Sequence, residues 1–535
     1  MSLRPIPKTV FRCYKTSGGK TLIETPIRLD SAGLEPSNML VIQDADITVQ
    51  QKSACFPKDS ADITAKYEIM AVLGVLELSL GKYLLAVATR VLVATIQSHK
   101  VWKITSGIII PLGKSSASPE AMDDLDLAKY AYDKGLLASV SKLMSDGFMY
   151  YSTSYDLTHS LQHNSLLNAK GLATVVDDRY YFNNFVQSTL TKASLSDKSV
   201  SDWITKTIFG FVGSTDMDCT FITTGIEKAK AYRVILISRI NRKRLGARYV
   251  RRGLDLNGNA ANNVEMEQIV FSLDVLKEKA ISSFCQIRGS APSIWGQELD
   301  LSYRPKLHLA DPNKDEVWSS TKKHFDDLKH QYIGEKSVPG TDKGGVVCVN
   351  LLDDIGFEKP LTDIFEKSVK RFNDSKLIYE SFPVTKWCKK MNYKNMDILM
   401  DRVRVNVLNS GWLLADGDIP TLNTADKLRC SRIQTGVVRV SCLDSLDRTN
   451  LTCSMFAKYV LPYQIQGISA DLPAVQVLAS TGVAPHEARD PAASVRLALA
   501  DSLPSLVNLW ADSGDAVSIL YAGTCALKGG NVYLT

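Results

Sequence analysis

The chain has 535 residues, of which 45% are hydrophobic and 22% charged, and its formal net charge is +6. This composition is typical of globular proteins, and the length predicts roughly two to four domains. A mostly disordered chain, a collagen-like chain and a low-complexity chain are excluded.

Cysteine and histidine usage limits the chemistry. Ten cysteines are scattered without any Cys-x-x-Cys pair, and the seven histidines are dispersed. We therefore expect reduced thiols in a cytosolic compartment, no structural metal site and no cofactor. The first 20 residues lack the apolar core of a signal peptide. The most apolar stretch, residues 67–96, is interrupted by Glu77, Lys82 and Arg90, so no transmembrane segment is predicted.

The first third of the chain is predicted to be rich in strands. In chain order, we expect strands over 66–111 with a turn at 81–82, a polar loop at 115–124, a helix near 125–145, and a strand and turn over 148–161. A shift in composition near residue 175 marks the predicted boundary between an N-terminal domain, 1–175, and a second domain, 176–535.

The remainder of the chain alternates between strands and helices. The expected elements are a strand over 232–240, a helix near 315–333, a strand over 346–352, a helix near 358–373, a strand over 376–382, a helix near 396–409 and a strand over 436–441. Such alternation predicts an α/β domain with a parallel or mixed sheet. Residues 471–499, rich in Ala and Pro, predict an irregular excursion.

The segment at residues 436–450 has the layout of a strand, a tight loop and a helix. The strand ends at Ser441, Cys442 follows, and five residues separate Cys442 from Arg448. Apolar residues then recur at helical spacing up to Pro462, the predicted helix end. A loop that closes onto a helix N-terminus directs several backbone N–H groups to one point, so it can bind an anion.

Cys442, at the entrance of this loop, is the candidate nucleophile. We expect the helix N-terminus and the Arg448 guanidinium to lower its pKa, so that the thiolate exists at neutral pH. Arg448 can hold two phosphate oxygens. Attack of the thiolate on phosphorus would give a cysteinyl-phosphate that water hydrolyses. The candidates for the general acid are carboxylates on loops, namely Asp444, Asp447, Asp416 and Asp418.

The spacing alone leaves a second interpretation open, in which Cys442 is a buried cysteine at a strand end and Arg448 lies on a helix surface. However, the segment CLDSLDRTN at 442–450 resembles the motif C-x-D-x-L-D-R-T-N of the Sac-domain phosphoinositide phosphatases. Further stretches resemble blocks of the same family, in the same order, at 150–162, 236–270, 282–297 and 509–530. The resemblance covers most of the chain from about residue 65.

The resemblance implies a fold of α/β and α+β type, in which a mostly-β N-terminal Sac domain packs on an α/β catalytic domain that carries the Cys-x5-Arg phosphate-binding loop. It implies an enzyme, a phosphatidylinositol-phosphate phosphatase that removes phosphate from the inositol ring of membrane phosphatidylinositol monophosphates. The 4-phosphate is favoured and the 3-phosphate comes next. The alternatives are a catalytically weak phosphoinositide-binding scaffold that retains the Sac fold, and a protein phosphatase with the same loop chemistry.

By motif position, Cys442 would be the nucleophile, Arg448 the phosphate clamp and Asp444 the acid. The other loop residues expected to bind the substrate are Ser445, Asp447 and Thr449.

Two positions depart from the family pattern. Ser441 stands where the family commonly has Asn, and residues 382–385 read Phe-Pro-Val-Thr where many members have Phe-Asp-Phe-His. The second departure motivates the scaffold alternative and bears on substrate preference and turnover, whereas intact Cys442 and Arg448 favour an enzyme. Some members carry a C-terminal membrane anchor; this chain ends at Thr535 without one, so we expect either a catalytic fragment or a soluble protein.

Residues 228–252 contain ten Lys or Arg and no Asp or Glu. They are either a solvated face or a surface that captures anionic lipid headgroups. The best candidates for headgroup binding are Arg239, Arg242, Lys243, Arg244 and Arg248. We therefore expect a cytoplasmic protein, peripheral on the cytosolic face of membranes, whose partners are phosphoinositide headgroups and an unidentified protein recruiter. Sparse aromatic residues in this stretch argue against nucleic acid.

Several other residues favour structural roles. His159 is expected to be a structural histidine, and Arg288 either lines the site or has a structural role at a strand end. Trp295 and Trp510 are expected to anchor a core, and residues 512–515 to cap the N-terminus of a helix.

Overall fold

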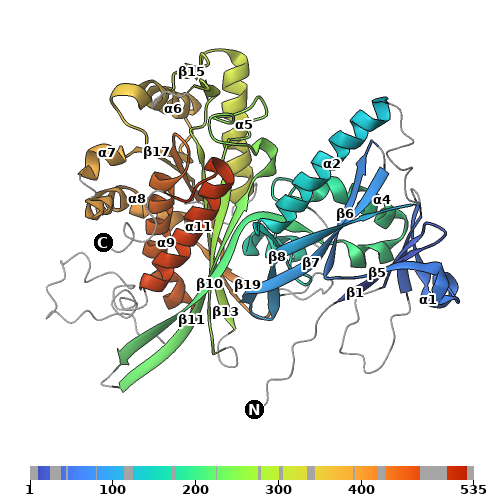
Figure 1. Cartoon of the computed structure of the whole chain (residues 1–535). Coiled ribbons are helices and arrows are strands. Elements are labelled where there is room, and N and C mark those ends of the chain that lie inside the picture. Colours follow the sequence, from blue (N-terminus) through green and yellow to red (C-terminus); the bar gives the residue numbers. More distant parts are fainter. Residues whose placement is uncertain are drawn as a thin grey trace. The chain divides into compact units, whose positions relative to one another are not determined.

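The computed structural model describes residues 10–24, 38–43, 46–79, 81–113, 124–169, 176–223, 226–274, 279–300, 305–333, 344–389, 392–419, 428–469 and 503–526. The chain forms two compact units (Figure 1). The first contains Met1–Val93, Lys100–Thr158 and Tyr181–Phe209; the second contains Ala94–His99, His159–Tyr180 and Gly210–Thr535.

This division differs from the predicted single boundary at residue 175, because the chain returns to the first unit after leaving it. Leu190, Val200 and Trp203, all beyond residue 175, lie in the core of that unit beside Phe11 and Ile69. The predicted loop at 115–124, apart from its last residue, and the excursion at 471–499 lie outside the described residues.

The first unit is built mainly of antiparallel strands. One sheet has the order β4 (Asp46–Gln51), β3 (Asn38–Gln43), β2 (Thr21–Glu24), β1 (Phe11–Thr16) and β5 (Ile63–Ile69). Further strands follow in the order β9 (Met149–Tyr151), β8 (His99–Pro111), β7 (Gly81–Ile96) and β6 (Ala71–Leu78). Its helices are α1 (Lys52–Cys55), α2 (Asp124–Ser145) and α4 (Asn184–Ser196). The predicted strands over 66–111 and the helix near 125–145 are therefore confirmed. The predicted turn at 81–82 is wrong, because both residues lie in β7.

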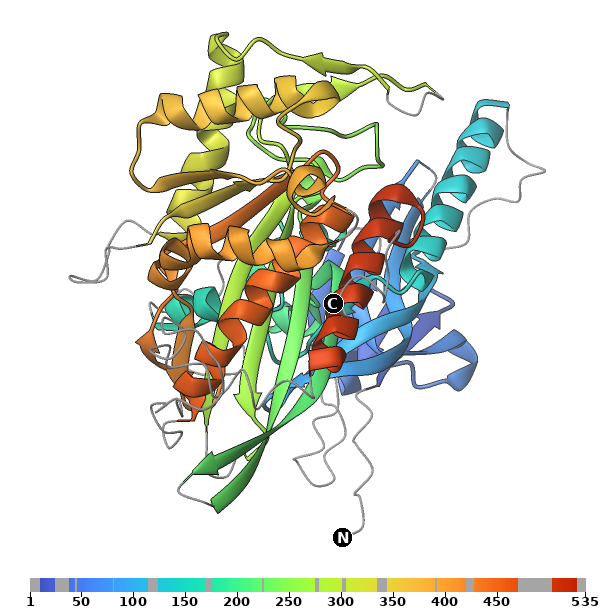
Figure 2. The same ribbon diagram turned by 90° about the vertical axis from the view of Figure 1, so that its left-hand side faces the viewer.

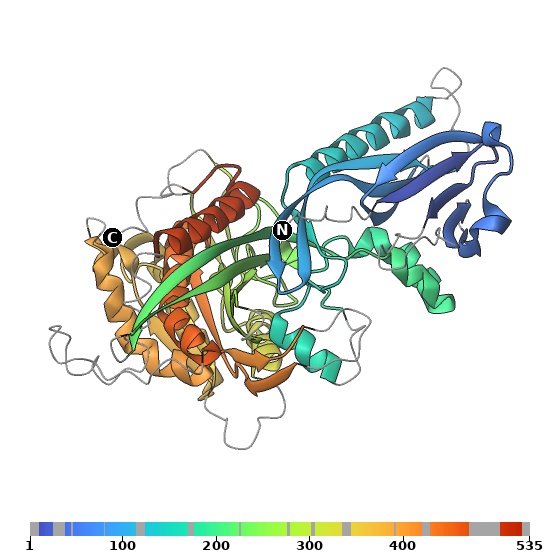
Figure 3. The same ribbon diagram turned by 90° about the horizontal axis from the view of Figure 1, so that it is seen from below.

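Helix α2 lies along β8 (Figure 3), and a glycine permits this close approach. A Cβ atom at Gly107 would lie 2.5 Å from the Met144 sulfur, which is shorter than any real contact. The strand therefore has no side chain at the point where the helix crosses it.

The second unit is organised around a mixed sheet. Its order is β17 (Leu377–Ser381), β16 (Val346–Asn350), β20 (Val437–Cys442), β13 (Ala280–Ser290), β12 (Val264–Ser272), β11 (Ile226–Ile240) and β10 (Thr207–Thr223). The first four strands are parallel and the rest antiparallel. β18 (Leu413–Asp416) pairs with the start of β13 and with β19 (Arg429–Arg432), and β14 (Trp295–Gln297) pairs with β15 (Leu307–Leu309). The predicted α/β architecture is confirmed.

Helices cover this sheet. α5 (Asp315–Tyr332) and α6 (Lys359–Phe372) pack on one face, where Phe325 and Phe365 belong to the same buried cluster as Val437 of β20. α9 (Asp447–Ile468) packs on β12, β13 and β20, with α11 (Leu503–Ala522) beside it, and Figure 2 shows both crossing the strands. The remaining helices of this unit are α3 (Leu161–Ala169), α7 (Val384–Trp387) and α8 (Met396–Ser410).

Two sequence-based boundaries are wrong. α9 does not stop at Pro462 but runs six residues further, to Ile468. Proline removes one backbone donor from a helix, yet Ile465 and Ile468 are buried beyond it, and this apolar face outweighs the lost hydrogen bond. Residues 512–515 lie inside α11 rather than at its start. A Cβ at Gly514 would lie 2.6 Å from the Asn450 amide, so Gly514 permits close packing of α11 on α9.

Candidate active site

The parallel strands β16, β17 and β20 end at the same edge of the sheet, and the candidate loop begins there. β20 is buried along its whole length, as expected for an apolar central strand covered by helices on both faces. Cys442, its last residue, pairs with Ser290, the last residue of β13. Residues 443–446 form the loop, and α9 begins at Asp447. The predicted layout of strand, loop and helix is therefore confirmed.

Two buried side chains from neighbouring segments hold the loop backbone. Arg288, near the end of β13, donates to the carbonyl groups of Ser445 and, at 2.9 Å, of Leu446. Asn262 donates to the carbonyl groups of Asp444, at 2.9 Å, and Ser445, at 3.3 Å. Ser445 has a φ angle of +60°, a conformation that few residues other than glycine adopt. The fold therefore holds the loop in a strained conformation. Of the two predicted roles of Arg288, the structural one is confirmed, because its side chain is fully buried and binds the loop backbone.

The Cys442 thiol is the centre of the loop's hydrogen bonds. The Ser445 N–H donates to its sulfur at 3.0 Å, and the Thr449 hydroxyl donates at 3.1 Å. The thiol in turn donates to Asp444 Oδ1 at 3.4 Å. Two of the predicted substrate-binding residues, Ser445 and Thr449, are thus brought to the sulfur. Asp447 occupies the first position of α9 and is half-buried.

The pKa of Cys442 differs from the sequence-based expectation. Burial and the Asp444 carboxylate raise this pKa, while the Arg448 charge and the Thr449 hydrogen bond act in the opposite direction without overcoming them. The expectation of a lowered thiol pKa is therefore wrong for the protein without substrate, since it counted the cation but not the burial and the carboxylates around it.

Asp444 has the opposite electrostatic situation. Burial alone would raise the pKa of its carboxyl group, but the neighbouring guanidinium groups of Arg448, Arg248 and Arg252 hold it below the ordinary value. Arg248 donates to Asp444 Oδ2 at 3.0 Å, and the Leu446 N–H donates to Oδ1 at 3.2 Å. Asp444 is therefore a carboxylate beside a neutral thiol.

Arg448 lies in the first turn of α9 and is paired with Glu358. Its Nη1 and Nη2 donate to the two carboxylate oxygens of Glu358 at 2.9 and 2.8 Å, and Nη1 also donates to the Leu351 carbonyl at 3.3 Å. Glu358 follows β16, which lies beside β20 in the sheet. Arg448 is not on an open helix surface, because its side chain is only 24% exposed.

The five predicted headgroup-binding cations are found in three environments. Arg239 is fully buried and bound to Glu265 and Glu267, so the prediction that it meets a headgroup is wrong: its hydrogen bonds lie inside the unit. Arg242 and Lys243 both pair with Asp178. Arg244 donates to the Arg252 carbonyl and Arg248 donates to Asp444 of the loop. Arg252, which was not among the five, donates to the Leu443 carbonyl of the loop and to Gln297.

Asp416 and Asp418 are excluded as acids for this loop. Asp416 pairs with Ala280, the first residue of β13, whereas Cys442 pairs with Ser290, the last. Ten residue steps along a strand correspond to about 33 Å. Asp416 binds Arg429, and Asp418 binds Lys279 at 2.7 Å.

The two departures from the family pattern have defined contacts. The Ser441 hydroxyl accepts a hydrogen bond from Arg439. Thr385, in the second departure, donates to the Asp353 carboxylate, and Lys386 pairs with Asp354 at 2.7 Å. The second departure therefore contacts the segment that leads to Glu358.

Three residues expected to have structural roles, His159, Trp295 and Trp510, are buried. The carbonyl group of His159 accepts from Arg239 at 2.9 Å, and its ring stacks on His163 with centroids 4.6 Å apart. Trp295 is buried in a cluster with Leu352 and Leu361, and Trp510 is buried in α11.

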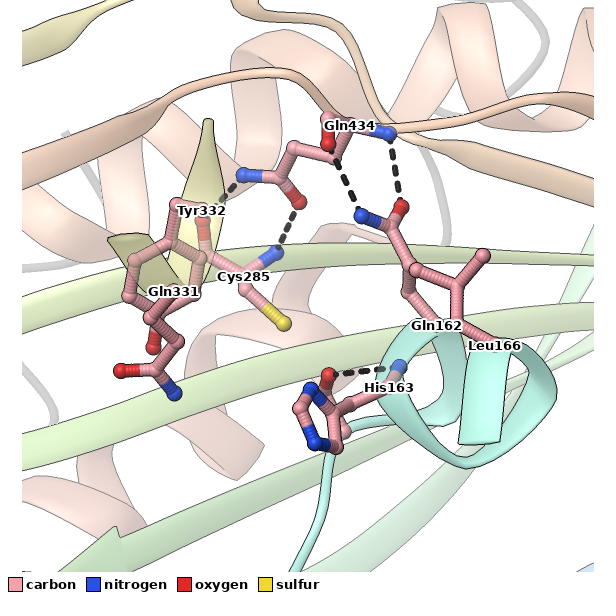
Figure 4. A pocket seen from close by; sticks show the side chains of 8 residues that line it. Gln162, His163, Leu166, Cys285, Gln331, Tyr332 and Gln434 are labelled. Atoms are coloured by element: carbon pink, nitrogen blue, oxygen red, sulfur yellow. Dashed lines mark hydrogen bonds between the residues drawn. The ribbon is translucent and has the colours of Figure 1, made fainter. Parts of the chain in front are cut away.

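A cavity of about 30 Å³ in this unit is lined by residues outside the loop (Figure 4). Gln434 bridges it, accepting from the Cys285 N–H at 2.9 Å and donating from its own N–H to Gln162 at 2.7 Å. Burial raises the pKa of the Cys285 thiol well above its ordinary value. The lining contains amides, a histidine, a tyrosine and a neutral thiol but no Lys or Arg, so this cavity lacks the cation that a phosphate site needs.

Two residues of the site, Glu358 and Asn262, were not identified from the sequence. Glu358 follows an apolar strand, and carboxyl ends of neighbouring parallel strands share one edge of a sheet, so strand order would have pointed to it. Asn262 lies in an irregular stretch before β12 and gives no pattern that sequence reasoning can use.

Within the described ranges, His, Cys, Asp and Glu side chains form no cluster that could hold a metal ion. In the same part of the chain, every helix is too short or too polar to cross a lipid bilayer.

The comparisons with known proteins bear on the whole arrangement. Phosphatidylinositol-3-phosphatase SAC1 of Saccharomyces cerevisiae is 29% identical over 467 residues, which cover 86% of this chain and 65% of the yeast protein. An uncharacterized Schizosaccharomyces pombe protein is 28% identical over 91% of this chain and 72% of its own length. Human phosphatidylinositide phosphatase SAC2 is 31% identical over 421 residues, 75% of this chain and 33% of the human protein.

The chain thus spans about two thirds of the yeast relative's length and one third of the human relative's. The sequence profile described as SacI homology domain matches residues 70–389, more than half of the chain, and this match ends before the loop at 442–448. The mixed α/β fold and this match together show that the chain belongs to the SacI homology domain family.

Proposed function

We propose that this chain is a phosphoinositide phosphatase that removes a phosphate from the inositol ring of membrane phosphatidylinositol monophosphates through a cysteinyl-phosphate intermediate. The observation that carries the proposal is the position of Cys442. Its sulfur receives the Ser445 N–H and the Thr449 hydroxyl, and it lies within the electrostatic influence of Arg448. The names of the yeast and human relatives, a phosphatidylinositol-3-phosphatase and a phosphatidylinositide phosphatase, support the substrate class.

Arg448 is the proposed clamp. Binding of the phosphate beside the guanidinium adds negative charge to the loop, and the guanidinium and the loop's N–H groups then stabilise the charge that develops on the phosphoryl oxygens. No cofactor is needed for this step, because the charge is supplied by the protein.

The proton of the thiol has a defined acceptor. The thiol already donates to Asp444, whose pKa is low while that of Cys442 is raised. As the sulfur–phosphorus bond forms and the phosphorus–oxygen bond to inositol breaks, the thiol proton passes to Asp444 and then to the inositol oxygen. A water then attacks phosphorus and gives one proton to Asp444, and the sulfur–phosphorus bond breaks. Asp444 returns this proton to the Cys442 sulfur, so phosphate is released and the thiol is restored. Asp444 thus serves first as base and then as acid.

The ring position follows the family resemblance, with the 4-phosphate favoured and the 3-phosphate next. Around the loop, Arg248 binds Asp444 at 3.0 Å, has a side chain 35% exposed and would face a bound headgroup. Arg252 is buried and supports the loop through the Leu443 carbonyl. We further propose that the protein acts peripherally at the cytosolic face of an anionic membrane, with Arg242, Lys243 and Arg244 as the cations that meet it.

The test is phosphate release from liposomes that each carry one phosphatidylinositol phosphate. We expect the native chain to release phosphate most rapidly from the 4-phosphate. Release by Cys442→Ser and by Arg448→Lys should fall to near background, since a serine hydroxyl is a poor nucleophile compared with a thiolate and lysine lacks the two-pronged guanidinium. Glu366→Gln, an exposed change on α6, serves as the matched control and should leave release unchanged.

Each outcome decides between the functions considered. Wild-type release that survives both substitutions would exclude the mechanism. Binding to phosphoinositide liposomes without release by the native chain would instead favour the scaffold alternative, and release from phosphopeptides but not lipids would favour a protein phosphatase.

A further inference from the structure

Glu358 is a buried carboxylate that the proposed reaction does not use, and it lies against the proposed clamp. It ends the short 3-10 helix Gly356–Glu358, and its side chain is only 11% exposed. Its two oxygens accept from both terminal nitrogens of Arg448, at 2.9 and 2.8 Å. This fork-to-fork pairing fixes the plane of the guanidinium as well as its position.

The described hydrogen bonds of Arg448 use the N–H groups on one edge of the guanidinium and leave those on another edge available to a ligand. A guanidinium has five N–H donors. In the described part of the chain, the hydrogen bonds of Arg448 go from Nη1 to Glu358 and to the Leu351 carbonyl, and from Nη2 to Glu358. These bonds engage both N–H groups of Nη1 and one of Nη2. The Nε–H and the second N–H of Nη2, which share the side edge of the group, are not used by them.

That side edge is suited to an oxyanion. Elsewhere in the same unit, Arg233 binds the Asp216 carboxylate through Nε and Nη2 at 2.7 and 2.8 Å, and Arg179 binds Asp177 through the same two nitrogens. Phosphate oxygens can be held by the same pair of donors. Glu358 and a phosphate can therefore bind Arg448 at the same time, on different edges.

Glu358 is itself held in place. Its Oε2 accepts from the Asp353 N–H at 2.9 Å, and the Asp353 carbonyl accepts from Thr362 of α6 at 2.9 Å. The Asp353 carboxylate receives the Thr385 hydroxyl from the segment after β17. The carboxylate is thus connected to the ends of two strands and to α6, which makes it a fixed support rather than a freely rotating partner.

We propose that Glu358 is a positioning residue for phosphate binding: it holds the end of the Arg448 guanidinium so that the side edge is presented to a phosphate bound over Cys442. This inference rests on the proposed function. It excludes a competing arrangement in which Glu358 occupies the phosphate's place and must be displaced, because the two oxyanions use different donors of Arg448.

The experiment measures binding of inorganic phosphate to the purified chain by isothermal titration calorimetry. The variants are Glu358→Gln, which keeps the size of the side chain, Arg448→Ala and the double variant, with Glu366→Gln of α6 as control. We expect Glu358→Gln to weaken phosphate binding roughly 10- to 100-fold, as misplacement of a binding group does. Arg448→Ala should weaken it at least as much, and the double variant no further.

Thermal unfolding of each variant checks that it is folded. Glu358→Asp, which keeps the charge but shortens the side chain, supplies a second substitution and should give an intermediate loss. The inference is overturned if Glu358→Gln binds phosphate as tightly as the wild type or more tightly. It is also overturned if adding Glu358→Gln to Arg448→Ala lowers the phosphate affinity by the same factor as it does in the wild type, since Glu358 would then act independently of Arg448.

Phosphate release from liposomes, measured in parallel, separates this inference from the proposed function. A wild type that binds phosphate in a Glu358-dependent way but releases none from lipids would remove the proposed activity and keep the positioning role. If the wild type is fully active and Glu358→Gln leaves its rate and KM unchanged, the proposed activity is kept and the positioning role of Glu358 is removed.

Discussion

Arg239 and Arg448 lie in the same unit, and each is paired with glutamate, yet their surroundings differ. Arg239 is fully buried and donates to Glu265 at 3.1 Å, to Glu267 at 2.6 Å and to the His159 carbonyl at 2.9 Å. Arg448 has one glutamate partner and a side chain that is 24% exposed. The first arginine is enclosed by the sheet, whereas the second reaches the sheet's edge with part of its hydrogen-bonding capacity unused.

Position in the sheet explains this difference. Arg239 is in β11 and pairs directly with Glu265 of β12, and the two glutamates are in turn bound by Tyr332, Ser283 and the Leu161 N–H. A strand interior surrounds a cation on every side. Arg448 follows a loop at the carboxyl ends of parallel strands. In the described part of the chain its side chain binds the Leu351 carbonyl and Glu358, both in the segment after β16, so a ligand can use its other N–H groups.

The largest expected effect follows from removing the enclosed cation. Arg239→Met would leave Glu265 and Glu267 buried without their counter-ion, and breaking a buried pair in this way costs about 3–5 kcal/mol. Urea unfolding at pH 7 should show a loss of that size. Arg448→Met is the matched comparison and should lose catalysis with a much smaller change in the free energy of unfolding. Equal losses of stability would remove the distinction between the two arginines.

Most of the sheet and its helices could be predicted from the sequence. The apolar runs at 346–352 and 436–441 are strands because a central strand covered on both faces needs apolar residues at every position. The loop at 442–448 was found because a nucleophile, an arginine and a helix start are local in sequence. The helix end at Pro462 was wrong because packing of later residues on the sheet outweighed a local rule.

Pairings that depend on strand order could not be predicted. Glu358 meets Arg448 across 90 residues because β16 lies beside β20, and Arg239 meets Glu265 through the register of β11 and β12. The place of Asp416 depends on strand pairing in the same way: the sequence suggested a loop, whereas Asp416 ends β18, which pairs with the start of β13. Local charge counting therefore overestimates the cations available to a ligand.

Arg439 differs from both Arg239 and Arg448: it is a fully buried cation, but among the described residues its hydrogen bonds go to neutral groups and not to a carboxylate. It donates to the Ser290 carbonyl at 2.7 Å and from Nε to His324 Nε2 at 3.3 Å, while His324 Nδ1 lies 2.9 Å from the Gly258 carbonyl. Burial and then the Arg439 charge lower the pKa of His324 to about 3. The histidine is therefore neutral in the folded protein and must gain a proton on unfolding in acid.

This proton uptake on unfolding makes the free energy of unfolding depend on pH. Because the pKa of His324 is about 3 when folded and 6.5 when unfolded, its stabilising contribution is complete above pH 6.5 and falls as the pH decreases from 6.5 towards 3. Between pH 6.5 and 5 the loss is about 2 kcal/mol, at 1.36 kcal/mol per pH unit. Urea unfolding at several pH values should show that His324→Gln removes this slope. The exposed His308→Gln should not, and a slope that survives in His324→Gln would assign it to other groups.

The smallest effect concerns the cations that remain near the surface. Arg242 and Lys243 have side chains 29% and 38% exposed and share one carboxylate, Asp178, so the pair retains about one positive charge. Near an anionic bilayer one such charge contributes about 1 kcal/mol, or a factor of about five in binding. Lys243→Gln removes one of these charges and should therefore slow phosphate release from anionic liposomes about fivefold at low salt and much less at high salt, because salt screens exposed charges. Lys370→Gln removes the same charge from an exposed position on α6. If both variants slow release equally, the effect is one of net charge, and the Arg242–Lys243 surface has no special role in meeting the membrane.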